Sequence, residues 1–87
     1  MKGQLIKNYI NKLTIQDINA LAIKQDIHLT DQELNYIYNQ IKNHYQDFLY
    51  GDANYLMNDL KQNVSENNYQ KIQKLFTHYK KQFQSLL

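Results

Sequence analysis

The sequence contains no cysteine, proline, arginine or tryptophan, and only two glycines in 87 residues. Without cysteine the chain has no disulfide framework, no thiolate nucleophile and no thiolate metal ligand. The lack of proline and the scarcity of glycine favour a mostly helical chain. The longest purely apolar run, Ala20–Ile23, is too short for a transmembrane helix or a signal peptide. We therefore expect a cytoplasmic protein that does not insert into membranes.

The most abundant residue types indicate a genome that is rich in A and T. The net charge is only +2, and all ten basic residues are lysine, beside eleven asparagines, nine isoleucines and eight tyrosines. These four residue types have AT-rich codons, which is typical of a low-GC bacterium. Many lysines and tyrosines therefore do not by themselves indicate a phosphate-binding or base-stacking surface.

Two capping boxes mark where helices begin. Thr30 and Glu33 stand three apart, and Leu29 and Leu34 flank them at the spacing of a hydrophobic staple. The long helix that starts there is expected to end at Gly51, in a left-handed conformation. Thr14 and Asp17 repeat the box sixteen residues earlier, with Leu13 and Ile18 as the staple.

Apolar residues recur at offsets of three and four along the whole chain, and no segment alternates with period two. The pattern predicts five helices, near residues 4–12, 15–25, 31–50, 53–63 and 66–85, with Asp52 and Ser65 as the caps of the last two. We predict an all-α fold, a compact bundle forming a single domain over residues 1–87. The predicted core is Leu5, Ile6, Ile10, Leu13, Ile18, Leu21, Leu34, Ile37, Ile41, Tyr45, Phe48, Leu56, Leu60, Ile72, Phe76, Tyr79 and Phe83.

Catalytic and metal-binding patterns are missing. The three histidines, His28, His44 and His78, lie 16 and 34 residues apart, which is not the spacing of a helical zinc site. Ser65 is expected to act as a helix cap, and no glycine-rich phosphate loop occurs. We expect no enzyme activity, no metal and no cofactor.

Nucleic-acid binding is the alternative function that the sequence leaves open. Lys71, Lys74, His78 and Lys81 fall on one face of the last predicted helix. Such a face could contact phosphates without reading sequence, although it also fits the solvated side of an amphipathic helix.

Protein binding is the function that we expect. Tyr36, Tyr50 and Tyr55 lie off the main apolar stripes or at helix ends, and tyrosine is favoured at interfaces. The end of the last helix carries Phe83 and Leu86, which are predicted to dock on a second copy or on a partner groove. The sequence thus predicts a non-enzymatic adaptor or regulator that binds another protein or itself.

The region around the second and third predicted helices resembles a known family. The residues that carry the resemblance are Leu13, Thr14, Asp17, Ala22, Ile27, Leu29, Thr30 and Asp31. They are similar to the YqfT-like proteins, small proteins of unassigned function from Bacillus-type Firmicutes. The resemblance covers about residues 5–45 and implies an all-helical cytoplasmic protein, with no active-site residues to carry over.

Overall fold

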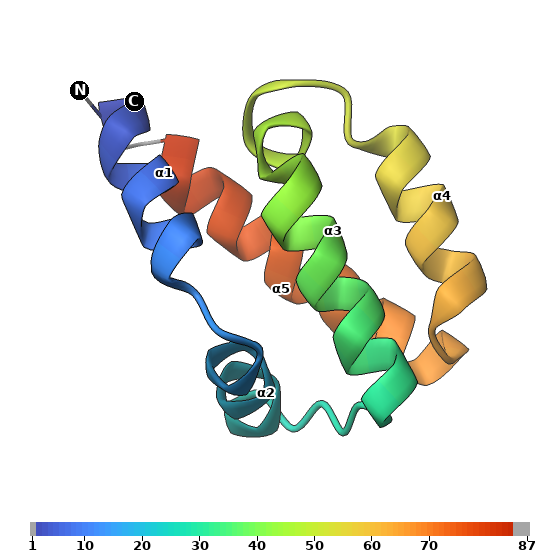
Figure 1. Cartoon of the computed structure of the whole chain (residues 1–87). Coiled ribbons are helices and arrows are strands. Elements are labelled where there is room, and N and C mark those ends of the chain that lie inside the picture. Colours follow the sequence, from blue (N-terminus) through green and yellow to red (C-terminus); the bar gives the residue numbers. More distant parts are fainter. Residues whose placement is uncertain (1, 85–87) are drawn as a thin grey trace.

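The structure is a computed structural model that describes residues 2–84 (Figure 1). Five helices follow one another: α1 (Lys2–Lys12), α2 (Ile15–Lys24), α3 (Asp31–Tyr50), α4 (Asn54–Asn63) and α5 (Glu66–Gln84). The described residues contain no strand. The predicted all-α fold with two long helices is therefore confirmed. None of the helices within residues 2–84 combines the length and the apolar character needed to span a bilayer.

Helix α3 is the centre of the bundle. Each of the other four helices packs against it, and α4 also packs against α5 (Figure 1). In the described part of the chain, by contrast, no Cα atom of α1 or α2 comes within 8 Å of one in α5. The molecule therefore has two groups of helices on α3, with α1 and α2 in one and α4 and α5 in the other.

Both predicted capping boxes are formed. The Thr14 Oγ1 atom accepts the N–H of Asp17 at 3.1 Å, and the Asp17 carboxylate accepts the N–H of Thr14 at 3.0 Å. Thr30 and Glu33 make the same reciprocal pair at 3.1 and 3.0 Å. These contacts span only three residues, so the sequence alone was sufficient to predict where α2 and α3 begin.

The junction between α3 and α4 differs from the prediction. Gly51 has an extended backbone (φ −113°), not a left-handed one, because the chain leaves α3 directly towards α4. Asp52 accepts the N–H of Asn54 at 2.9 Å, but α4 begins one residue later than expected, after a buried Ala53. The helix α3 is also kinked, since His44 has non-helical angles (φ −133°, ψ 16°).

The core is smaller than predicted. Leu5 was expected inside but is 71% exposed, because α1 packs only on α3 and covers only the side that carries Ile6 and Ile10. The side chain of Phe83 lies outside the described residues. The buried apolar residues are Ile6, Ile10, Ile18, Ala22, Ile27, Leu49, Ala53, Leu56 and Leu60. Ten others from the predicted core are only half-buried: Leu13, Leu21, Leu34, Ile37, Ile41, Tyr45, Phe48, Ile72, Phe76 and Tyr79.

Candidate functional site

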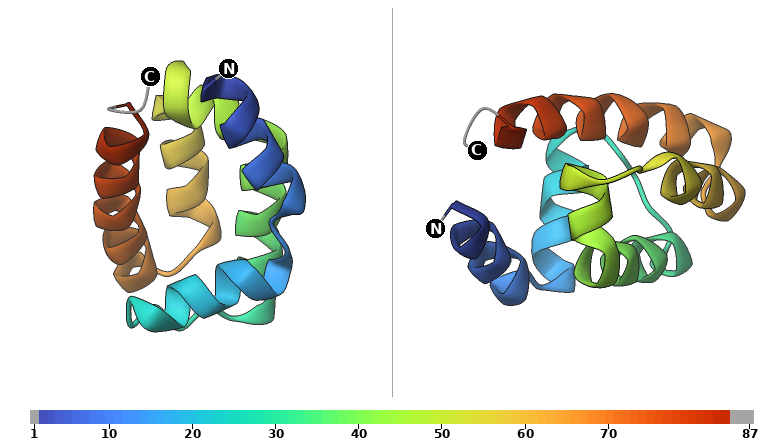
Figure 2. Two further views of the ribbon diagram at one scale, coloured as in Figure 1. Left: turned by 90° about the vertical axis from the view of Figure 1, so that its left-hand side faces the viewer. Right: turned by 90° about the horizontal axis from the view of Figure 1, so that it is seen from above.

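An apolar groove with a volume of about 600 Å³ lies between the two groups of helices. Helix α5 forms one wall, α1 and α3 lie on the opposite side, and α2 runs across one end of the groove (Figure 2). Residues of α4 also line it. Its half-buried lining is almost entirely apolar: Leu13, Leu21, Leu29, Ile37, Ile41, Tyr45, Phe48, Met57, Ile72, Leu75, Phe76 and Tyr79. The groove therefore contains most of the predicted core residues that the structure leaves half-buried.

The volume of the groove shows whether it can be a sealed cavity or must be open to solvent. A dry cavity destabilises a protein by about 24 cal/mol per Å³, so a sealed void of 600 Å³ would cost roughly 14 kcal/mol. A domain of 87 residues has a total stability of about 4–13 kcal/mol. The space is therefore a groove open to solvent. Tyr9, which is 58% exposed, and the exposed Lys12 lie at its edge.

Three charged residues line the groove. Lys12 stands on the α1 wall, Lys80 on the α5 wall, and Asp17 at the start of α2. The carboxylate of Asp17 is engaged in capping, and the backbone hydrogen bond from Thr14 lowers its pKa. The Nζ atom of Lys80 lies 5.9 Å from the centre of the Phe76 ring. Both lysines therefore border apolar surface, one from each wall.

A buried polar cluster holds the α5 wall in place. The Glu33 carboxylate accepts the N–H of Thr30 through Oε1, and through Oε2 it accepts the N–H of Ser65 at 2.7 Å. Asn68 donates its side-chain amide to Glu33 Oε1 at 3.1 Å and to the carbonyl of His28 at 3.0 Å. One carboxylate thus caps α3 and also binds the residue that caps α5.

The hydrogen bonds of Glu33 determine its charge state. Burial by itself raises the pKa of Glu33, but the N–H groups of Thr30 and Ser65 and the Asn68 amide more than offset this and lower it. The residue is 8% exposed, so its negative charge depends on these donors. Sequence analysis found the contact with Thr30 but missed those with Ser65 and Asn68, which are 32 and 35 residues away.

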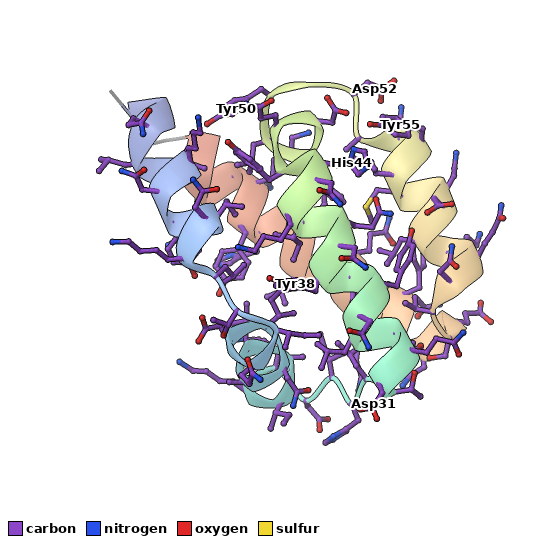
Figure 3. The ribbon with its side chains drawn as sticks, in the orientation of Figure 1. Asp31, Tyr38, His44, Tyr50, Asp52 and Tyr55 are labelled. Atoms are coloured by element: carbon purple, nitrogen blue, oxygen red, sulfur yellow. The ribbon has the colours of Figure 1, made fainter. Side chains whose placement is uncertain are left out.

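The predicted interface tyrosines do not line the groove. Tyr36 is half-buried and donates its hydroxyl to Asp59 of α4, so burial and this hydrogen bond raise its pKa. Tyr55 is exposed and donates to Asp47, a hydrogen bond that raises its pKa as well. Tyr50 is 48% exposed and lies with Tyr55 at the end of the molecule where α3 passes into α4 (Figure 3). The side chain of Phe83 and the whole of Leu86 lie outside the described residues, so their role stays a prediction.

The predicted lysine face is divided by the fold. Lys71 is half-buried and donates to the carbonyl of Asp26 at 2.8 Å, with the Asp26 carboxylate 3.7 Å away. Lys74, His78 and Lys81 remain exposed on α5. One of the four predicted phosphate contacts is therefore occupied by the connector between α2 and α3.

The part of the chain that the structure describes shows no group of metal-binding side chains. Among residues 2–84, no three His, Cys, Asp or Glu side chains are grouped as metal ligands would be. In comparisons with protein-family models, curated proteins and solved structures, the chain matches none of them. The groove is therefore the feature of the described residues on which a functional argument can be built.

Proposed function

We propose that this protein is a non-enzymatic interaction module of the cytoplasm that binds a partner protein in the apolar groove. The observation that carries the proposal is the groove itself, which leaves twelve large apolar side chains half-covered in a domain of 87 residues. Contiguous apolar surface of this kind on a small domain marks a binding site. The proposal places the partner between α1 and α5, whose Cα atoms are all more than 8 Å apart in the described residues.

The shape of the groove favours an α-helix as the bound element. An amphipathic helix presents apolar residues at i, i+3, i+4 and i+7 and keeps its polar face in water. A groove that is apolar at its base and open along one side accommodates both requirements. A small ligand is normally enclosed over 70–90% of its surface, which fits an open groove less well.

Site-specific photo-crosslinking tests the proposal. A photoreactive phenylalanine analogue replaces Tyr9, which lines the groove and is 58% exposed, and in a control protein it replaces Tyr50. Tyr50 is the same residue type with a similar exposure of 48%, and it does not line the groove. Both side chains are largely solvent-exposed, so neither replacement disturbs the core.

The expected result is a nuclease-resistant crosslink to a discrete protein from position 9 and not from position 50. Mass spectrometry of the crosslinked peptide should locate the contact in an amphipathic helical segment of the partner. Equal labelling from both positions contradicts a groove-specific site. Crosslinks from position 9 only to nucleic acid or lipid also contradict it, and the nucleic-acid result would favour the alternative function.

A further inference from the structure

The charges on the two walls indicate which kind of helix the groove accepts. We infer that the partner helix carries carboxylates along the flanks of its apolar stripe, which pair with Lys12 on one wall and Lys80 on the other. This inference rests on the proposed function, because it names the chemistry of the partner for the same groove. Its structural basis is the placement of one lysine on each side of an apolar base.

Both walls are basic beyond these two residues. Every charged residue of α1 is a lysine, and α5 carries four lysines against a single carboxylate, Glu66 in its first turn. In contrast, α3 carries Asp31, Glu33 and Asp47 against one lysine. The slight net charge of the chain therefore conceals an uneven distribution, with an excess of positive charge on α1 and α5, of which Lys12 and Lys80 line the groove.

Two other charged groups near the walls are hydrogen-bonded within the domain. The amine of Lys42 donates to the carbonyls of Ile10 and Asn11, at 2.6 and 3.0 Å, and so satisfies the end of α1. Asp17 is held by the N–H of Thr14. Lys12 and Lys80 are therefore the two cationic groups of the groove lining, beside a single carboxylate, that of Asp17 at the start of α2, which stays ionised.

An acidic helix fits these features better than nucleic acid does. Phosphate binding needs several basic groups along a polar surface, whereas here two lysines border a wide apolar surface. Glutamate side chains on the flanks of an amphipathic helix can reach both lysines while the apolar stripe covers the base. Flanking charge pairs mainly supply specificity, and the apolar stripe supplies affinity.

A displayed library of amphipathic helices provides the test. Each peptide has about 15 residues, roughly four turns, with apolar residues on one face and Glu, Gln or Lys at random on the flanks. The baits are the wild-type protein, the double variant K12Q/K80Q, and the matched control K24Q/K74Q. The control removes two exposed lysines, one from α2 and one from α5, so both variants have the same net charge. A fourth bait, Tyr9→Ser, reports whether binding uses the groove.

The expected result is a set of glutamate-flanked binders from the wild-type and K24Q/K74Q baits. Re-synthesised with lysine flanks, these peptides should bind about tenfold more weakly at low salt. The preference should disappear in K12Q/K80Q and shrink as salt is raised. Tyr9→Ser should weaken all binders alike.

The contrary results separate the two proposals. Binders that are weakened by Tyr9→Ser but show no preference for glutamate overturn the charge inference and leave the groove function standing. If the selection yields no binders, or only binders that ignore Tyr9→Ser, both proposals fail. A glutamate preference lost only in K24Q/K74Q assigns acid binding to the outer lysines and also overturns the inference.

Discussion

The substitution Glu33→Gln tests whether one carboxylate joins α3 to α5. The carboxylate accepts three donors: Oε1 takes the N–H of Thr30 and the amide of Asn68, and Oε2 takes the N–H of Ser65. A glutamine side chain of the same size offers one oxygen and one NH₂ group. The NH₂ group must then face an N–H donor in a site where Glu33 is 8% exposed.

The expected loss of stability follows from the N–H donor that Glu33→Gln leaves without an acceptor. A buried donor left without an acceptor costs about 1–3 kcal/mol, so we expect Glu33→Gln to lower the free energy of unfolding by about 2 kcal/mol at pH 7. With a urea m-value of about 1 kcal/mol/M for a domain of this size, the midpoint moves by roughly 2 M. Equilibrium urea denaturation followed by far-ultraviolet circular dichroism measures the shift.

The pH dependence gives a second measurement. The pKa of Glu33 is lower in the folded protein than its ordinary value, so its contribution to stability is complete above that ordinary value and is lost as the pH falls through the folded pKa. The difference between wild type and Glu33→Gln should therefore narrow as the pH falls below the ordinary pKa of a glutamate carboxyl, about 4.3, and the folded protein takes up a proton at Glu33.

The matched control is Asp17→Asn. Asp17 forms the same capping box in α2, but it is exposed and binds no second helix, so its midpoint should move far less. A shift for Glu33→Gln no larger than that of the control, or one that does not change with pH, would refute the role of Glu33 in holding α5.

Three further measurements follow from the packing. Lys42→Met removes the amine that binds the last carbonyls of α1, so amide hydrogen exchange should speed up in α1 while α4 is unchanged. Thr30→Ala should cost about 1 kcal/mol in urea denaturation through loss of the α3 cap. Phe76→Ala was expected from the sequence to cost roughly 3–5 kcal/mol, but it should cost only about 2 kcal/mol, because Phe76 is half-buried and contacts Phe48 edge-on at 4.9 Å. Leu56→Ala should cost more, because Leu56 is only 3% exposed. If thermal denaturation shows the reverse order, the placement of Phe76 in the groove is wrong.

Sequence periodicity located the apolar faces but not what covers them. Ile41, Ile72 and Phe76 were predicted as core because they recur at helical spacing, and in the fold they line an open groove. A stripe on one helix shows which side avoids water. It does not show whether the opposing surface belongs to the same chain, so the groove could not be predicted from the pattern.

For the candidate functional residues too, the sequence predicted the helix face, and the fold decided which partners each side chain meets. The lysine face of α5 was predicted from its spacing, yet the fold ties Lys71 to Asp26 and brings Lys80 to the groove. Tyr36 was predicted as an interface residue and instead donates to Asp59 across the junction of α3 and α4. Both outcomes depend on neighbours more than 20 residues away in the chain.

The sequence by itself determined that the chain forms five helices and where α2 and α3 begin. The reciprocal contacts of Thr14 with Asp17 and of Thr30 with Glu33 span one turn, so they need no information about the rest of the chain. Tertiary structure alone decided that Glu33 also binds Ser65 and that α5 stands apart from α1 and α2. The physical reason is that hydrogen bonds within one turn are set by local geometry, whereas the separation of two walls depends on how every helix packs on α3.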